Sequence, residues 1–277
     1  MFKKIVIPTL IICSILPFSC TEIEEVNIKD NFVVEAFLFA EEAVTNIRLK
    51  TTFPISAAED DSDPINEASV QLIKNNTTYD LVATGTDGFY HYPDTDLNIF
   101  SGDLFSLKVN YKSRSASAQT IVPVSPTGVN INVDSVVIPR VNLSPASLEL
   151  LREVLQGLFI NVAWENPTED WYYIVVENIE QIKDPIFPAV VEEALEFFRF
   201  VSDPTQNDAE LIIGAGLRHY GTHQVTVYRV NQEYADLFEN STQDSRDLNE
   251  PPSNIENALG IFTAFASERI FFEVLEE

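Results

Sequence analysis

The chain of 277 residues carries 43 acidic and 17 basic side chains, a formal net charge of −26, and 45% apolar residues. At ~150 residues per domain, this length predicts one large or two modest domains with a buried core rather than a disordered chain. The acidity argues against a nucleic-acid partner, because phosphate binding needs clustered Lys and Arg. The nine glycines are about 3% of the chain, against a usual share of ~7%. Glycine-rich loops that bind phosphate are therefore not expected.

The N-terminal residues have the layout of a secretory signal peptide. Two lysines precede an apolar run from Ile5 to Leu16, and the small residue Ser19 stands before Cys20. A positive segment, an apolar segment and a small residue at the cleavage position are typical of such peptides. Leu16–Cys20 resembles a loose bacterial lipobox. We therefore expect residues 1–19 to be removed and the Cys20 thiol to receive a diacylglycerol lipid.

Two alternative interpretations of this segment are weaker. A transmembrane anchor needs ~20 apolar residues, and this run is shorter and is interrupted by Pro8 and Pro17. Lipidation at Cys13 would place the bulky Ile12 at the cleavage position. With Cys20 as the single cysteine of the mature chain and committed to lipid, no disulfide is expected, and the acyl chains hold the protein on a membrane.

Residues 20–30 are interpreted as an acidic tether. Glu22, Glu24 and Glu25 follow the cysteine closely. The stretch resembles the export signal that sends Bacteroidota lipoproteins to the outer face of the outer membrane, and an ordinary charged tether is the alternative. The expected location is the outer membrane, with the lipid-anchored chain facing the cell surface.

Residues 31–124 are predicted to form an immunoglobulin-like β-sandwich. Seven short segments rich in Val, Ile, Phe and Tyr recur at roughly 10-residue spacing. They are Phe32–Phe39, Val44–Thr52, Ala68–Lys74, Thr78–Thr84, Gly88–Tyr92, Leu104–Tyr111 and Ser115–Val122. Asn75-Asn76 is the expected hairpin tip, because asparagine tolerates a left-handed backbone. The proline-containing stretch Val122–Gly128 is the expected linker.

Residues 129–277 are predicted to form a second β-rich domain with a few helices. A strand over Asn130–Ile138 precedes a helix with Ser144 as N-cap and Pro145 at its first position. The expected apolar face of this helix carries Leu148, Leu151, Leu155 and Leu158. Further strands are expected over Phe159–Trp164, Trp171–Ile179 and Ala258–Leu275, and further helices over Pro188–Phe200 and Asn231–Glu239. The predicted fold class is mostly β.

Motifs for metals and cofactors are weak. The three histidines are His91, His219 and His223. The last two are four residues apart, but Val225–Tyr228 favours a strand, where ~3.3 Å per residue separates the imidazoles too far to chelate zinc easily. Gly214-Ala215-Gly216 begins like a dinucleotide fingerprint, yet position 219 is not glycine and no helix pattern follows. We expect neither metal nor cofactor.

Two acidic loops offer oxygen ligands of the kind that calcium prefers, Glu59–Asp63 and Asp94–Asn98. In the second loop Ile99 and Phe105 stand where an EF-hand loop needs glycine and glutamate. Solvated loops are therefore expected in both places. Asp134-Ser135-Val136 fits a short O-glycosylation pattern, although three-residue patterns also arise by chance.

No motif for nucleophilic catalysis is present in the sequence: there is no Gly-x-Ser-x-Gly elbow, and no free thiol remains once Cys20 is lipidated. Paired carboxylates for glycoside hydrolysis stay open, because 43 acidic residues supply many pairs. Several aromatic residues could stack on sugars, but packing between strands is the expected role. They are Trp164, Trp171, Tyr172, Tyr173 and the run Phe89–Tyr92. The chain is expected not to be an enzyme.

A series of short segments extends over nearly the whole mature chain in a fairly specific order. In the first half these are Val33–Ala36, Asn66–Val70, Asp87–Tyr90 and Ile121–Pro123. In the second half they are Asp134–Val136, Trp171–Tyr173, Asn249–Pro251, Asn254-Ile255 and Leu259–Phe262. The series resembles a family of Bacteroidota lipoproteins of unknown function, often encoded beside TonB-dependent receptors. The resemblance implies a β-sandwich N-terminal domain, a second β-rich domain and a place on the cell envelope, and it supplies no catalytic residue.

The sequence thus predicts a surface lipoprotein of the outer membrane, anchored through Cys20. Its expected role is that of a non-enzymatic binding or accessory subunit of an outer-membrane β-barrel, most plausibly a TonB-dependent transporter. Two other roles stay open, an envelope hydrolase acting on glycan or peptide through paired carboxylates, and a structural subunit of a larger outer-membrane machine.

Overall fold

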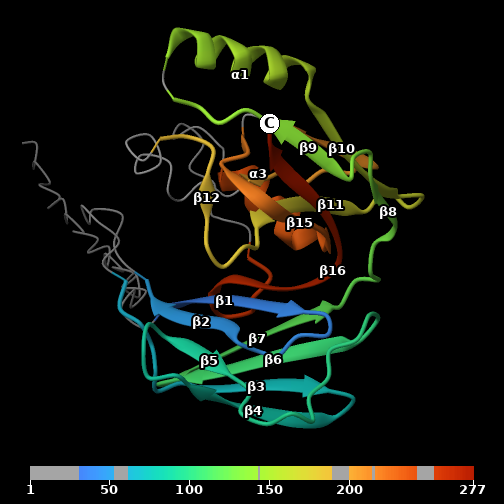
Figure 1. Ribbon diagram of the computed structural model, residues 1–277. Helices are drawn as coiled ribbons and strands as arrows, with labels where there is room; N and C mark the ends of the chain where they lie inside the picture. Colours follow the sequence, from blue (N-terminus) through green and yellow to red (C-terminus); the bar gives the residue numbers. More distant parts are fainter. Residues whose placement is uncertain (1–30, 53–61, 143, 189–199, 214–215, 242–252) are drawn as a thin grey trace, which may run out of the picture.

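The computed structural model describes residues 31–52, 62–142, 144–188, 200–213, 216–241 and 253–277. These residues form two lobes built almost entirely of β-strands, with one helix at the far end of the second lobe and one near the junction (Figure 1). The predicted fold class, mostly β with a few helices, is confirmed. No helix in the described ranges is both long and apolar enough to cross a bilayer.

The first lobe is a sandwich of seven strands whose pairing is immunoglobulin-like. They are β1 (Phe32–Phe39), β2 (Asn46–Thr51), β3 (Ser69–Lys74), β4 (Thr77–Ala83), β5 (Phe89–His91), β6 (Leu104–Tyr111) and β7 (Arg114–Ile121). One layer has the order β1-β2-β5 and the other β4-β3-β6-β7, with a short β4–β5 pairing that joins their edges. Alternate residues of β1 are fully buried between the layers, as expected for a strand with one solvated face.

The hairpin between β3 and β4 turns at the predicted residues. Asn75 and Asn76 have φ angles of 50° and 64°. Two successive left-handed residues make the tight turn that matches the twist of the flanking strands. The predicted hairpin tip is confirmed.

The second lobe is also a sandwich, with two sheets packed around a separate core. Its smaller sheet has the order β14 (Ala209–Ile213), β10 (Phe159–Glu165), β8 (Thr127–Ile131). The larger sheet contains β9 (Ser135–Ile138), β11 (Trp171–Asn178), β12 (Asp184–Pro185), β13 (Phe200–Val201), β15 (His219–Val230) and β16 (Leu259–Glu276). The strand expected over Asn130–Ile138 is in fact two strands, β8 and β9, because the chain passes from one sheet to the other between them.

Helix α1 (Pro145–Gly157) begins as predicted, because the Ser147 N–H donates to Ser144 Oγ at 3.2 Å. Its apolar face is only partly buried. Leu151 is 8% exposed and packs in the second core, whereas Leu148 is 44% exposed. The helix lies at the far end of the second lobe (Figure 1), and its predicted apolar face is buried at Leu151 but not at Leu148.

Helix α3 (Gln232–Ser241) follows Asn231, as predicted. The Asn231 side chain does not cap it in the usual way, because its amide nitrogen donates to Thr120 Oγ1 and to the Ile121 carbonyl of the first lobe. The backbone carbonyl of Asn231 accepts from Tyr234 instead. The helix expected over Pro188–Phe200 lies outside the described residues, except for its two ends.

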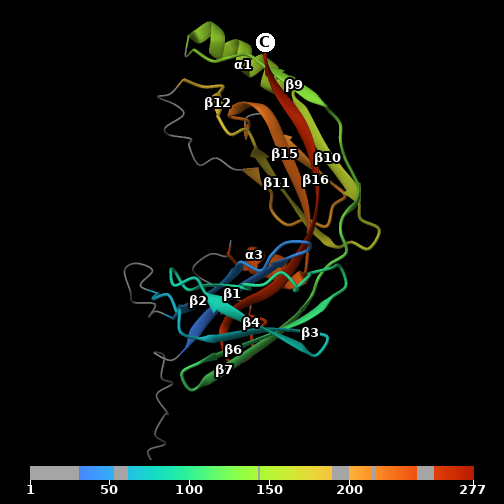
Figure 2. The same cartoon turned by 60° about the horizontal axis from the view of Figure 1, so that its bottom comes forward.

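Strand β16 belongs to both lobes (Figure 2). Residues 259–265 pair in parallel with β1 of the first sandwich, and residues 265–274 pair with β15 of the second. Ile255, Phe262 and Ala264 lie in the core of the first lobe. The predicted boundaries, 31–124 and 129–277, therefore need a correction. The stretch around residues 254–265 completes the first sandwich, because β1 would otherwise be an unpaired edge with a buried face.

An aromatic cluster fills the junction between the lobes. Phe265 packs against Phe39 with ring centroids 4.9 Å apart, and it also contacts Tyr173, Tyr228 and Tyr234. These residues come from β1, β11, β15, β16 and α3. The shared strand and the shared core fix the two lobes relative to each other.

Polar contacts at the start of α3 bridge the two lobes as well. The Thr120 hydroxyl of β7 donates to Glu233 at 3.2 Å, and Trp171 Nε1 of β11 donates to Gln232 at 2.8 Å. Both acceptors lie in the first turn of α3. The first turn of α3 is thus hydrogen-bonded to one strand of each sandwich, β7 and β11.

Candidate functional site

A cavity of about 280 Å³ opens in the second lobe where β11 ends and β15 begins. Its wall is partly apolar and partly basic. The apolar lining residues are Val176, Ile179, Phe200, Ile212 and Leu217, and the basic ones are Lys183, Arg218, His219 and His223. Glu177, Asn178 and Gly216 complete it. We refer to it as the basic cavity, since four residues of basic type in one place are unusual in a chain of net charge −26.

The structure brings His219 and His223 to one cavity, although they were expected to be too far apart for joint metal binding. His223 is 4% exposed, and its Nδ1 lies 3.0 Å from the Gly221 carbonyl. Its ring stacks on Phe272 with centroids 5.3 Å apart. Burial, with smaller effects of His219 and Lys183, lowers the pKa of His223, so the ring is neutral near pH 7.

Lys183 is held at the mouth of the basic cavity by Asn178. Its ammonium donates to the Asn178 backbone carbonyl and, at 2.9 Å, to the Asn178 side-chain oxygen. Nearby, Glu180 accepts hydrogen bonds from the Thr222 N–H and hydroxyl at 2.9 and 2.8 Å. These bonds lower the pKa of Glu180, which keeps it ionised and tied to β15. The loop that carries Lys183 is thereby anchored to the sheet.

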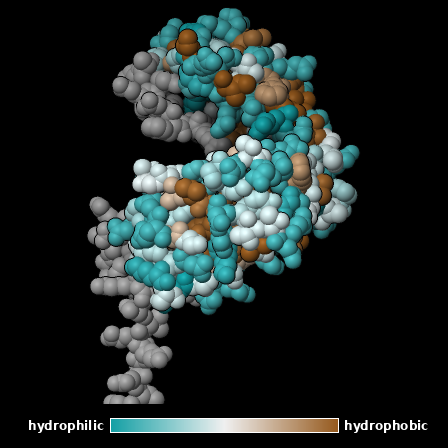
Figure 3. Space-filling model, turned by 90° about the horizontal axis from the view of Figure 1, so that it is seen from below, coloured by the Kyte–Doolittle hydropathy of each residue, from teal (hydrophilic) through white to brown (hydrophobic). Residues whose placement is uncertain are grey.

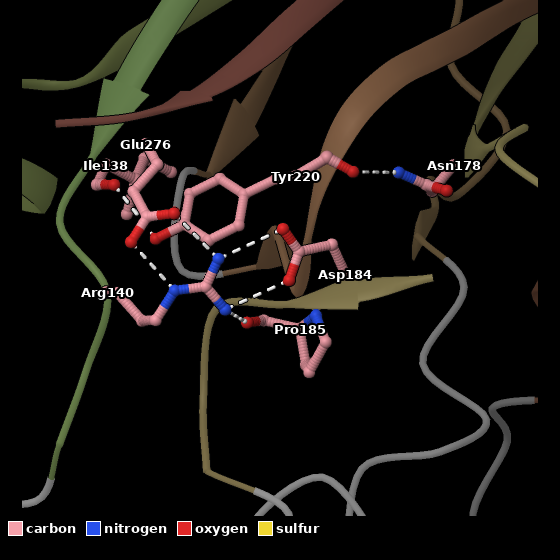
Figure 4. A network of polar contacts seen from close by, with 7 residues as sticks. All are labelled: Ile138, Arg140, Asn178, Asp184, Pro185, Tyr220 and Glu276. Atoms are coloured by element: carbon pink, nitrogen blue, oxygen red, sulfur yellow. Dashed lines mark hydrogen bonds and ion pairs between the residues drawn. The ribbon is translucent and has the colours of Figure 1, made fainter. Parts of the chain in front are cut away.

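Arg140 is the centre of a polar network in the second lobe (Figure 4). Its guanidinium makes two hydrogen bonds of 2.8 and 2.7 Å to Glu276 and two of 2.9 and 3.0 Å to Asp184. It also donates to the Pro185 carbonyl at 2.9 Å and lies 4.8 Å from the centre of the Tyr220 ring. Every N–H of the guanidinium is engaged, so this is a structural tie between β12, β15 and the end of β16.

Removing the hydrogen bonds of Arg140 should lower the stability of the fold less as the pH falls. Arg140 lowers the pKa values of Asp184 and Glu276 through hydrogen bonds to their ionised forms. Depressed carboxyl pKa values stabilise the fold above their ordinary values of 3.8 and 4.5. The contribution is lost as the pH falls through the lower folded values. Arg140→Met should therefore unfold at lower urea than wild type at pH 6, and this difference should shrink at pH 3.

A matched control for that experiment is Arg152→Met, because Arg152 makes a single exposed ion pair with Glu149 on α1. It should change the urea midpoint little at either pH. If the difference in urea midpoint between wild type and Arg140→Met stayed constant from pH 6 to pH 3, the stabilising role of the Arg140 ion pairs would be contradicted.

Four of the aromatic residues considered for sugar stacking pack inside the protein, whereas Phe89, Tyr92 and Trp171 are half-buried. Trp164 and Tyr172 are 4% and 2% exposed, with ring centroids 5.3 Å apart in the second core. Tyr173 stacks on Tyr228 at 4.9 Å in the junction cluster. Tyr90 is 1% exposed, and its hydroxyl donates to the Ile65 carbonyl at 3.0 Å. Packing is their observed role, as expected.

The remaining candidates are placed as follows. In the loop Asp94–Asn98, Asp96 accepts a hydrogen bond of 2.7 Å from Tyr92. In the described ranges, no three His, Cys, Asp or Glu side chains are grouped so as to hold a metal. Ser135 is exposed at the start of β9. Three further candidates fall wholly or largely outside the described residues. They are Cys20, the loop Glu59–Asp63 up to residue 61, and Gly214-Ala215.

Carboxyl groups with raised pKa values would mark a hydrolase acid. The described carboxyls with a resolved shift are Glu180, Asp184 and Glu276, and each pKa is lowered. Nothing in this set favours the paired-carboxylate alternative.

A family profile described as a domain of unknown function, DUF4249, matches residues 17–270. The chain belongs to the DUF4249 family. No curated protein matches it in sequence. The resemblance to a family of unknown function is thus confirmed at this coarser level.

Two solved structures are similar at low level to this DUF4249 chain. A two-domain fibronectin type III segment from chicken tenascin has 10% identity and a TM-score of 0.24, covering 87% of this chain and 99% of that one. Domains A168–A170 of titin have 11% identity and a TM-score of 0.20, covering 88% of this chain, which spans 62% of theirs. At such scores the fold assignment rests on the strand pairing described above.

Motif residues of the DUF4249 chain have structural roles. The Gly88 N–H donates to the Asn66 side chain at 3.2 Å. Asn254 binds both the N–H and the carbonyl of Phe262, at 2.9 and 2.7 Å. Gly260 lies against the backbone of Val34, where a side chain would not fit. The order of these motifs therefore reflects the fold, and it identifies no reactive group.

Sequence reasoning did not single out Arg140, Lys183 or Arg218. The available signal was the scarcity of basic residues, 17 in 277. In so acidic a chain a basic side chain that is not paired locally is a candidate for a tertiary role. Lys183 and Arg218 meet in the basic cavity through segments between β11 and β15, whereas Arg140 follows β9 and meets β12 and β16, and no periodicity in the sequence marks either arrangement.

Proposed function

We propose that this DUF4249 protein is a lipoprotein anchored through Cys20 at the surface of the outer membrane, where it is a non-enzymatic binding or accessory subunit of a β-barrel resembling a TonB-dependent transporter. The observation that carries the proposal is the N-terminal sequence, a positive segment and an apolar run that end at Ser19-Cys20. The resemblance of the motif series to Bacteroidota lipoproteins supports it.

The position of β1 indicates how a protein anchored at Cys20 would be oriented relative to the membrane. Phe32 follows Cys20 by about a dozen residues, which reach at most ~40 Å when extended. The other end of β1, Phe39, pairs with Phe265 at the junction with the second lobe. Phe32 therefore lies at the end of the first sandwich that is remote from the second. A lipid at Cys20 would leave the second lobe as the part farther from the membrane.

The joined lobes support a binding role. In the space-filling view a notch separates the two lobes on one side (Figure 3). The continuous strand β16 and the aromatic junction fix the two lobes relative to each other. A surface that is already ordered loses less conformational entropy when a partner docks. The joined lobes thus offer a partner protein an ordered surface that both sandwiches contribute to.

The proposal is tested by expressing the wild type and Cys20→Ala with a C-terminal affinity tag in the native host. We expect the wild type in the outer-membrane fraction, and crosslinking before purification should recover a β-barrel protein with it. Cys20→Ala should leave the outer-membrane fraction and lose the barrel, because two or more acyl chains supply the anchoring free energy.

Cys13→Ala is the matched control, since Cys13 is the alternative acceptor in the same segment. It should remain in the membrane and keep its partner. Release of Cys13→Ala, or retention of Cys20→Ala, would contradict anchoring at Cys20. Repeated recovery of the wild type without any barrel would contradict the accessory role, and recovery of a large multi-protein assembly would favour the structural-subunit alternative.

A further inference from the structure

We propose that the basic cavity of the second lobe binds a small organic carboxylate that carries an apolar substituent. This ligand site is additional to the proposed docking role and does not depend on it. The cavity lies inside one sandwich, between β11, β15 and the loops that precede β12 and β15.

Charge is the first observation. Among the described lining residues Lys183 and Arg218 are cationic and Glu177 is the single acidic one, while His219 and the neutral His223 add imidazole nitrogens. The rest of the chain is strongly acidic, so its long-range field repels anions. A basic cavity within such a field favours an anion locally, because the nearby charges act at short range and are screened less.

The buried imidazole of His223 is the second observation. Because a carbonyl can only accept, Nδ1 must carry the proton shared with Gly221, which leaves Nε2 of the neutral ring as an acceptor. The His223 side chain lines the cavity. A bound anion would favour the imidazolium form, whose Nε2–H can then donate to the ligand.

The donors of the cavity are suited to a carboxylate. Lys183 uses Asn178 as acceptor for two of its three N–H groups, which fixes the ammonium and leaves one donor. Arg218 stacks on Phe187, with its guanidinium carbon 5.3 Å from the ring centre, so its planar head is also held in place. Preorganised cationic donors form charge-assisted hydrogen bonds with carboxylate oxygens.

The size and the apolar wall select the rest of the ligand. At about 280 Å³ the cavity lies at the small end of ligand sites, which are typically ~300–1,000 Å³. Ile212 and Leu217 are 1% and 4% exposed and form part of its wall. A fully hydrated inorganic anion would leave this wall in contact with water. A compact carboxylate with an aromatic or branched aliphatic group fills both parts of the cavity.

The test uses the purified full-length lipoprotein in detergent micelles and the probe 4-fluorobenzoate, followed by ¹⁹F NMR line broadening and shift. The neutral isostere 4-fluorobenzamide is measured in parallel, with detergent alone as the blank. We expect saturable binding of the carboxylate and at least tenfold weaker binding of the amide. Absence of saturable binding of the carboxylate, or equal binding of both probes, would overturn the proposal.

Two variants locate the site. Lys183→Met removes one charge at the cavity mouth and should weaken 4-fluorobenzoate binding about tenfold. Lys108→Met removes the same charge from an exposed position on β6 of the first lobe and should leave binding unchanged. Both side chains are exposed, so neither variant should compromise folding. Equal weakening by both would show a general charge effect and would overturn the assignment to this cavity.

Discussion

Gly260→Ala should lower the free energy of unfolding by about 3 kcal/mol. Gly260 lies on β16 with φ +111°, a conformation that residues with a side chain rarely adopt. A Cβ at this position would lie 2.0 Å from the Val34 carbonyl oxygen of β1. The backbone of β1 is buried in the sandwich and cannot move away cheaply, so the parallel β1–β16 pairing must open. Urea unfolding followed by far-UV circular dichroism measures the effect.

Gly85→Ala separates backbone strain from steric clash. Gly85 also has a positive φ, +84°, but a Cβ there would meet no atom within 4 Å. Only the conformational cost applies, roughly 1–2 kcal/mol for a left-handed residue. If Gly260→Ala were no more destabilising than Gly85→Ala, the close approach of β16 to β1 would be refuted.

Phe265→Ala should lower the free energy of unfolding by about 3–5 kcal/mol, the usual range when a buried phenylalanine is truncated to alanine. Phe265 is 3% exposed and touches the rings of Phe37 and Phe39 as well as three tyrosines. It stands where β16 passes from the first sandwich to the second. Its truncation leaves a cavity in the only apolar cluster of the described residues that draws on both lobes. The lobes should then unfold less cooperatively.

That loss of cooperativity is measurable because both tryptophans, Trp164 and Trp171, lie in the second lobe. Tryptophan fluorescence follows that lobe, whereas far-UV circular dichroism follows both. In the wild type the two urea transitions should coincide, and in Phe265→Ala they should separate. Phe271→Ala on the same strand is the control. Phe271 is 51% exposed, so Phe271→Ala should lower the free energy of unfolding by less than about 1 kcal/mol. Its two urea transitions should still coincide. Coincident transitions in Phe265→Ala would contradict the coupling role.

Local sequence signals predicted the individual elements well. Enrichment in apolar and aromatic residues between turn-forming residues located β1 and β6 to the residue, at Phe32–Phe39 and Leu104–Tyr111. Ser144-Pro145 marked the start of α1, since capping depends on neighbouring residues alone. The apolar face of α1 is exposed at Leu148, because the pattern shows which residues share a face but not how much of that face another element covers.

Long-range pairing was outside the reach of such signals. The segment Ala258–Leu275 was predicted as a strand, but nothing in it shows that its first part pairs with β1, more than 200 residues earlier in the chain. The basic cavity likewise depends on contacts between segments that are far apart in the chain. His219 and His223 were weighed as a pair on one strand, whereas Lys183 reaches them from a different loop.

The sequence by itself determined the mostly β class, the seven strands of the first sandwich, the tight turn at Asn75-Asn76, the acidity, and the lipobox-like segment that motivates Cys20 as an anchor. These follow from composition, period and neighbouring residues. Only the tertiary structure decided that one strand completes both sandwiches, that Gly260 must lack a side chain, and that four basic residues line one cavity. Those features depend on contacts between segments far apart in the chain, and such contacts are set by packing of the whole core rather than by any local preference.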